Sequence, residues 1–168
     1  AYDSPEAADE IFVYEKDGFR IAVLNYVYGS NAGSGSLYGA PYSLNMLDEE
    51  KIYYDVMRAR EISDFVIVCP HWGTEYNIGI DASQYYWSEL FNEGGVALVI
   101  GTHPHVIEPI EEIVREDGFR TIVYYSIGNF VSNQDNAYSL LGAMATITLR
   151  KNASGIHVDD YGAIPLIT

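Results

Sequence analysis

Three of the four histidines in the sequence follow apolar runs, the position at which α/β proteins commonly place side chains that do chemistry. His71 comes directly after FVIVCP in the segment DFVIVCPHWGTEY, and His103 and His105 follow VALVIG in the segment that contains GTHPHVIEP. Imidazole is a common nitrogen ligand of Zn, Mn and Fe. We therefore consider a divalent metal site with these three histidines as candidate ligands.

The spacing of His103 and His105 bears on the number of ions in such a site. In an extended chain, residues two apart share one side and are separated by about 6.6 Å along the backbone. This spacing is wide for a single zinc ion and suits a pair of ions about 3.5–4 Å apart. No aspartate lies nearby to bridge two ions. The available carboxylates are Glu75, Glu108 and Glu111, and the acidic run EPIEEIVRED around Glu111 also fits a segment that faces solvent.

The histidines also have a plain structural interpretation. A histidine that follows a strand often caps it or forms a hydrogen bond with a neighbouring loop, and we interpret His157 in the segment ASGIHVDD in this way. For the other three, the spacing alone leaves both alternatives open.

The predicted elements bring these residues to one edge of a sheet. Residues 65–70, 96–101 and 119–128 are apolar runs of strand length, typical of strands that are covered on both faces. Helices are predicted at residues 48–63 and 83–93, each with one apolar face. Strands that alternate with helices indicate a parallel sheet and the α/β class. The carboxyl ends of parallel strands share one edge of the sheet.

Antiparallel strands are predicted toward both ends of the chain. Residues 11–29 are predicted to form two strands joined by a turn at Lys16-Asp17-Gly18, and residues 143–150 alternate as a strand with one exposed face does. Residues 30–46 are rich in Gly, Ser and Asn and predict a long loop, which we expect to border the histidine edge. Asn129, in the segment SIGNF, comes at the end of the third buried run.

Composition narrows the classes of partner. A chain of 168 residues suits one domain over residues 1–168. The net charge of −15, from 24 Asp and Glu against 9 Lys and Arg, argues against nucleic acid or an anionic membrane surface as a partner. No apolar run reaches the roughly 18 residues of a membrane span, and residues 1–10 lack the features of a signal peptide. The chain as given is therefore expected to be soluble.

Three segments of the sequence resemble the CapA family of capsule-synthesis proteins, which is associated with poly-γ-glutamate. They are HWGTEY, GVALVIGTHPHVIEPIE and VYYSIGNFVSNQ, in that order, and GFRIAVLNYVYGSN resembles the segment that precedes them. The family is similar to the calcineurin-like metallophosphoesterases. The resemblance implies a β-sandwich flanked by helices, with two metals at strand ends.

The resemblance also assigns roles to individual residues. His71 matches a lone histidine ligand after a central strand, and His103 and His105 match a closing His-x-His pair. Glu75 lies in a matching motif and joins the three histidines as a candidate catalytic residue. Glu111 and Asn129 also lie in matching motifs, and they are candidates for residues that contact the metal ligands without binding the metal themselves.

One departure from the family pattern changes what the chain is expected to do alone. The Asp-x-His, Gly-Asp and Asn-His motifs that open the superfamily are not found, and the first histidine is His71. The chain thus resembles the C-terminal half of a CapA-like domain, with its mixed sheet. It would supply at most three ligands to Mn, Zn or Fe, an incomplete site, and is expected to be inactive without the N-terminal half.

The resemblance implies two functions that the sequence does not separate. The first is a metal-dependent hydrolase or transferase, active in the full-length protein on a phosphoester or an anionic polymer, in capsule or poly-γ-glutamate synthesis or export at the bacterial cell surface. The alternative is a polymer-binding or assembly factor that keeps the fold without catalysis. Expected partners are the N-terminal half, other capsule-synthesis subunits or a second copy of the chain, and the parent protein is expected to be extracytoplasmic and membrane-anchored.

Overall fold

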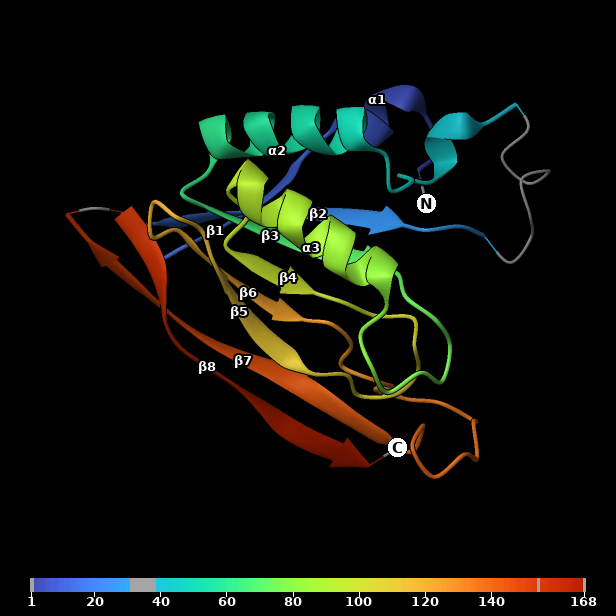
Figure 1. The fold of residues 1–168 in the computed structure, drawn as a ribbon. Coiled ribbons are helices and arrows are strands. Elements are labelled where there is room, and N and C mark those ends of the chain that lie inside the picture. The colour runs from blue at the N-terminus through green and yellow to red at the C-terminus, as the bar shows by residue number, and fades with distance from the viewer. Residues whose placement is uncertain (1, 31–38, 154, 168) are drawn as a thin grey trace.

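The structure is a computed structural model that describes residues 2–30, 39–153 and 155–167. Its main element is a six-stranded sheet with the strand order β1-β2-β3-β4-β6-β5, and the β7–β8 hairpin forms a second sheet (Figure 1). The strands of the main sheet are β1 (Phe12–Lys16), β2 (Phe19–Val27), β3 (Phe65–His71), β4 (Leu98–Ile100), β5 (Ile110–Val114) and β6 (Arg120–Tyr124).

The centre of the main sheet is parallel and its two edges are antiparallel. β2, β3, β4 and β6 pair in parallel, whereas β1 and β5 pair antiparallel with β2 and β6. The three predicted buried strands are confirmed as the neighbours β3, β4 and β6. The last of them is shorter than the predicted 119–128, and just after it the Tyr125 carbonyl accepts a hydrogen bond from the Trp72 indole at 2.8 Å.

Two long helices, α2 (Glu49–Ile62) and α3 (Ala82–Gly94), cover one face of the main sheet (Figure 1). The Asp48 side chain accepts a hydrogen bond from the Lys51 amide and caps α2, as predicted. α3 begins before the predicted Ser83. Asp81 is its N-cap, and the side chains of Asp81 and Gln84 each accept a hydrogen bond from the other residue's backbone amide, which makes a capping box. A short helix, α1 (Pro5–Asp9), precedes β1.

The hydrophobic core has two layers, one on each face of the main sheet. On the helix side, apolar side chains of α2 and α3 pack on alternate residues of β2 and β3, and the buried set includes Ala22, Leu24, Ile52, Val56, Ala59, Val66, Val68 and Phe91. On the opposite face, the hairpin packs on the remaining strand residues, and this set includes Phe65, Leu98, Ile122, Tyr124, Ala145, Ile147, Leu149, Ile156 and Val158. The fold is therefore a helix layer, a mixed sheet and a two-stranded sheet.

Two strands were not predicted from the sequence. The acidic run EPIEEIVRED forms β5, an edge strand whose exposed and half-exposed residues alternate. The strand predicted at 143–150 extends to β7 (Leu141–Asn152), and residues after it return as β8 (Gly155–Ile167). Both missed strands carry many charged or exposed residues, because each has one face toward solvent and pairs at an edge.

The loop predicted at residues 30–46 lies partly outside the described residues, since 31–38 are not described. Residues 41–43 form a short 3-10 helix, and Met46 pairs with Val27 at the carboxyl end of β2. In the edge strand β1, Phe12 and Tyr14 are 64% and 48% exposed. None of the helices in the described part of the chain has the length and apolar character needed to cross a membrane.

Candidate functional site

The three histidines lie together at the carboxyl edge of the parallel strands. His71 is the last residue of β3 and forms a bridge with Thr102, which follows β4. Two backbone hydrogen bonds fasten this bridge, from the Trp72 amide to the Thr102 carbonyl and from the Thr102 amide to the Pro70 carbonyl, both at 3.0 Å. The parallel pairing of β3 and β4 therefore places His71 and the His103–His105 segment side by side at the carboxyl ends of these strands.

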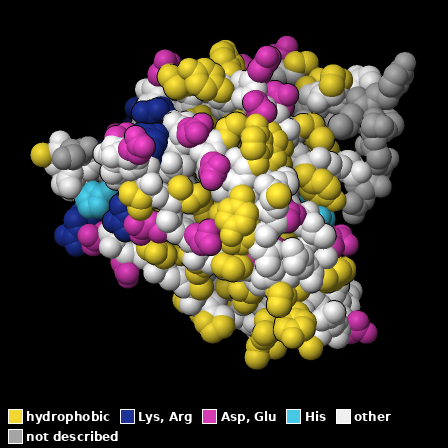
Figure 2. All heavy atoms as spheres, in the orientation of Figure 1, with side chains coloured by type: hydrophobic (Ala, Val, Ile, Leu, Met, Phe, Trp, Pro, Cys, Tyr) yellow, Lys and Arg dark blue, Asp and Glu magenta, His cyan; other side chains and the backbone are white. Residues whose placement is uncertain are grey.

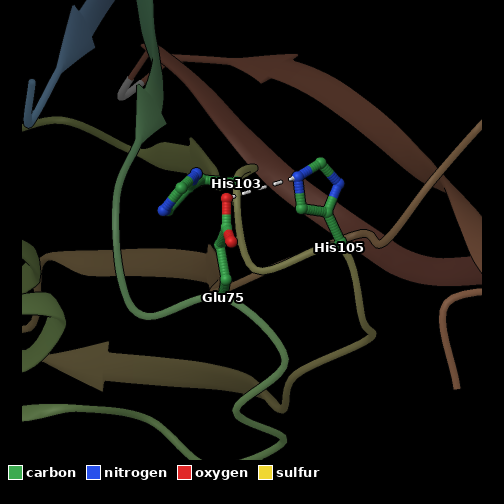
Figure 3. Close-up of side chains that lie close together, drawn as sticks. All are labelled: Glu75, His103 and His105. Carbon is green, nitrogen blue, oxygen red and sulfur yellow. Dashed lines mark ion pairs between the residues drawn. The ribbon is translucent and has the colours of Figure 1, made fainter. Parts of the chain in front are cut away.

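The rings of the histidines are close, and Glu75 lies among them. The ring centroids of His71 and His103 are 4.6 Å apart, and those of His103 and His105 are 6.1 Å apart. Figure 3 shows Glu75 pointing between the imidazoles of His103 and His105. One potential ligand atom from each of these three residues lies within 4.8 Å of the other two. Among the described residues, this is the group whose side chains best suit a metal ion.

The segment that contains His103 and His105 is bent, which corrects an expectation drawn from its sequence. The extended chain predicts that the two side chains are too far apart for one zinc ion. In the structure both residues have left-handed backbone, with φ of 106° at His103 and 61° at His105. The bend brings their ring nitrogens together, so that small side-chain movements would let both contact a single ion. Strained backbone of this kind is common at functional sites.

The local environment lowers the pKa of two of the imidazoles, those of His71 and His103. Burial lowers the pKa of His71, and the neighbouring His103 and His105 rings lower it further. Burial also lowers the pKa of His103, an effect that the Glu75 carboxylate opposes. Neutral imidazole has a free lone pair on one nitrogen, which is the form that binds metal ions.

Two tyrosines border the histidine cluster. The Tyr28 ring lies 4.6 Å from the His103 ring, centroid to centroid, and the Tyr76 ring stacks on His105 at 6.0 Å. Both tyrosines are 48% exposed, so each has a free side toward solvent. The sequence analysis did not assign Tyr28 to the site, although it directly follows β2. Functional side chains commonly follow the carboxyl ends of parallel strands, and the same rule that identified His71 would have identified Tyr28.

The remaining predicted site residues have different surroundings. Asn129 lies against the cluster, with its side-chain oxygen 2.8 Å from His105 Nδ1. Glu111 is part of β5, pairs with Val123 and does not belong to the group of close ligand atoms. Together with burial, the Glu111 carboxylate raises the pKa of Tyr125 to about 12. His157 lies in β8 opposite Arg150, away from the strand ends that carry the cluster.

One of the three carboxylates that the sequence made available to the site, Glu108, is buried and lies outside the group of close ligand atoms. Glu108 is only 2% exposed and accepts a hydrogen bond from Gln84 Nε2 at 2.6 Å. Burial raises its pKa to about 7. Gln84 also belongs to the capping box of α3, and Asp81 of that box accepts a hydrogen bond from Thr74, next to Glu75. The pair thus connects the start of α3 with the loops on which the cluster is built.

The donor set fits a divalent transition metal. Imidazole nitrogen with carboxylate oxygen is a combination that Zn, Mn and Fe accept. His103 is buried, whereas His105 and Glu75 are partly open to solvent, so an ion could enter and could keep a free coordination position. The roles of His71, His103, His105 and Glu75 as ligands remain predictions.

Two known proteins are similar to this chain in sequence. PGA biosynthesis protein CapA of Bacillus subtilis (strain 168) is 30% identical over 154 residues, which is 92% of this chain and 39% of that protein. Capsule biosynthesis protein CapA of Bacillus anthracis is 29% identical over 149 residues, which is 86% of this chain and 35% of that protein. The chain therefore spans little more than a third of the length of either relative.

Solved structures agree on the fold. The sulfate thiohydrolase SoxB of Thermus thermophilus matches 94% of this chain with a TM-score of 0.56, at 16% identity and over 24% of its own length. A presumptive 5′-nucleotidase of Staphylococcus aureus matches 94% of this chain with a TM-score of 0.57, at 14% identity and over 29% of its own length. These neighbours have metallophosphoesterase-type folds, which confirms the fold class that the resemblance implied.

The family model described as bacterial capsule synthesis protein PGA_cap matches residues 1–134. The match includes every residue of the histidine cluster and extends from before α1 to the segment after β6. With the strand-end histidines, the mixed sheet and the two relatives in agreement, the chain belongs to the bacterial capsule synthesis protein family PGA_cap.

Proposed function

We propose that this chain supplies one side of a divalent metal site in a capsule synthesis protein, with His71, His103, His105 and Glu75 as its ligands. The observation that carries the proposal is the group of ligand atoms from Glu75, His103 and His105 within 4.8 Å of one another. Capsule synthesis as the process is supported by the family and by both relatives. The metal would be Zn, Mn or Fe, because the donors are imidazole and carboxylate.

The proposed activity is metal-dependent hydrolysis or transfer on a phosphoester or on an anionic polymer such as poly-γ-glutamate. When bound, the metal would lower the pKa of a coordinated water and polarise the substrate. The chain's own residues hold and orient that centre: β3 fixes His71, and the bent 103–105 segment presents two rings from one short loop. Tyr28 and Tyr76 form its open border, where a substrate would enter.

The site needs further ligands, and we propose that they come from the rest of a longer protein. The chain spans 39% and 35% of its two relatives, so such a protein has ample length to provide them. An aspartate, which commonly serves as the bridging carboxylate of a two-metal hydrolytic site, is absent from the cluster among the described residues. We further propose that this longer protein is extracytoplasmic and membrane-anchored, where capsule polymer is assembled.

Isothermal titration of Zn or Mn into the longer protein tests the metal site. His103→Ala should abolish or strongly weaken binding, because loss of one nitrogen ligand removes a large part of the coordination sphere. His157→Ala is the matched control, since this histidine lies in β8 outside the cluster and its loss should leave binding unchanged. Equal metal affinity in the wild type and in His103→Ala would overturn the proposal.

A second measurement separates catalysis from assembly. Cells that carry the double variant His71→Ala with His103→Ala should lose capsule polymer if the site is catalytic. Full polymer production by a variant that no longer binds metal would instead support the polymer-binding or assembly role. Hydrolysis of a generic phosphodiester and of poly-γ-glutamate by the purified protein then indicates the substrate class.

A further inference from the structure

The side chain of Asn129 is held in one orientation by its neighbours. Its Nδ2 donates hydrogen bonds to the Ser139 backbone carbonyl and to Gln134 Oε1, both at 3.0 Å. A backbone carbonyl can only accept, so the atom that faces Ser139 must be the amide nitrogen. The Asn129 oxygen is therefore the atom that faces His105, at 2.8 Å from Nδ1.

This orientation decides which nitrogen of His105 carries the proton. An amide oxygen can only accept, so Nδ1 of His105 must be the donor of the hydrogen bond. A neutral imidazole with its proton on Nδ1 has its lone pair on Nε2. The Nε2 atom lies 4.0 Å from Glu75 Oε1, inside the candidate ligand group. The chain thus turns the free lone pair of His105 toward the place where a cation would bind.

Two further residues complete a closed ring of contacts around His105. Gln134 Nε2 donates to the Tyr76 hydroxyl at 3.1 Å, and the Tyr76 ring stacks on the His105 imidazole with 28° between the planes. The Tyr76 amide also donates to the Pro104 carbonyl at 2.8 Å. These contacts join three separate segments of the chain, so the position of the His105 ring depends on tertiary structure and not on its own loop alone.

We propose that Asn129 is a positioning residue, which fixes His105 as its Nδ1–H tautomer and directs Nε2 to the metal position, while Gln134 and Tyr76 support the position of the ring. Histidines that bind metals commonly donate their other ring N–H to an oxygen acceptor, which orients the ring and raises its basicity. The statement about the metal rests on the proposed function. The statement about the tautomer does not, because it follows from hydrogen bonds within the chain.

Long-range ¹H–¹⁵N correlation spectra of the metal-free chain, labelled at histidine nitrogen, test the tautomer. The spectra are recorded at a pH where the imidazoles are neutral, and single His→Ala variants assign the four rings. In the wild type, Nδ1 of His105 should appear as the protonated nitrogen. Asn129→Ala should shift the ring toward the Nε2–H form, which free imidazole of histidine favours. A wild-type ring protonated at Nε2, or one that Asn129→Ala leaves unchanged, would overturn the proposal.

Other variants distinguish positioning from a general effect on folding. Asn129→Asp cannot donate to the Ser139 carbonyl, but it should retain the Nδ1–H tautomer because a carboxylate accepts the hydrogen bond from Nδ1 more strongly than an amide does. Gln134→Ala should also retain it, because the Ser139 carbonyl still orients the amide. The His157 signals should stay the same in all variants and report an intact hairpin. Loss of the Nδ1–H form in Asn129→Asp, in a chain whose His157 signals are unchanged, would contradict the assigned role.

Zinc affinity of the longer protein then tests the consequence for the metal. Asn129→Ala should weaken binding by about 10–100-fold, the usual effect of removing the acceptor behind a ligand histidine, and Asn129→Asp should weaken it less. Equal affinity in the wild type and in Asn129→Ala would overturn the positioning role while leaving the proposed metal site in place. Absence of binding in the wild type would refute the proposed function, and the tautomer result would still stand.

Discussion

Replacement of Glu108 by glutamine is expected to stabilise the chain at alkaline pH relative to the wild type, and much less so at acidic pH. Glu108 is 2% exposed, and one of its oxygens accepts a hydrogen bond from Gln84 Nε2. The other oxygen has no hydrogen-bond partner among the described residues. Burial and, to a smaller extent, the nearby Asp81 raise the pKa of this carboxyl from 4.5 to about 7, although the hydrogen bond from Gln84 opposes the change.

The sign and size of the effect follow from proton linkage. A carboxyl group with a higher pKa in the folded state binds its proton more tightly when folded, so the free energy of unfolding falls as that proton is lost. The fall begins near the unfolded pKa of 4.5 and is complete above the folded pKa of about 7. These two pKa values correspond to about 3 kcal/mol in total, of which about 2.5 kcal/mol falls between about pH 5 and about pH 8.

Urea unfolding at several pH values, followed by tryptophan fluorescence, measures this difference. The free energy of unfolding of Glu108→Gln minus that of the wild type should rise by about 2.5 kcal/mol from about pH 5 to about pH 8. Comparison with the wild type at each pH cancels the titration of the other carboxylates. Glu112→Gln is the matched control, because Arg120 lowers the pKa of Glu112 below its usual 4.5, so this carboxyl stays ionised in both states from about pH 5 to about pH 8 and the difference between the variant and the wild type should stay nearly constant there. A difference for Glu108→Gln that does not change with pH would refute the reasoning.

Three further substitutions test the packing that supports the site. Gly101→Ala should destabilise the chain by about 3 kcal/mol or more in thermal unfolding, since a Cβ there would lie 2.0 Å from the Tyr125 carbonyl oxygen; a normal melting temperature would contradict this backbone approach. Trp72→Phe should lower the free energy of unfolding in urea by about 2–4 kcal/mol, because the buried side chain becomes smaller and the Tyr125 carbonyl loses its hydrogen-bond donor. A decrease of less than about 1 kcal/mol would show that this hydrogen bond contributes little. Arg150→Ala should change stability by less than about 1 kcal/mol, because its ion pair with Asp159 is exposed, and a larger loss would mean that the pair anchors the hairpin.

The central architecture could be predicted from the sequence because its signals are local. The apolar runs at residues 65–70 and 96–101 are long enough to specify buried strands without knowledge of their partners. The Asp48 cap fixes the start of α2 within a few residues of chain. The position of His71 and His103 directly after two such strands was sufficient to place their rings together, since parallel strands end at a common edge.

Other features were decided only by the tertiary structure. β5 and β8 have weak patterns of their own and form because β6 and β7 offer free edges to residues nearby in the chain. The bend at His103 and His105 depends on backbone bonds to other segments, such as the one from Tyr76 to Pro104, which no local pattern reveals. The sequence alone thus determined that the three histidines gather at the sheet edge. Long-range contacts decided their geometry, the burial of Glu108 and the orientation of the His105 ring, because each depends on groups that only the folded chain brings within hydrogen-bonding distance.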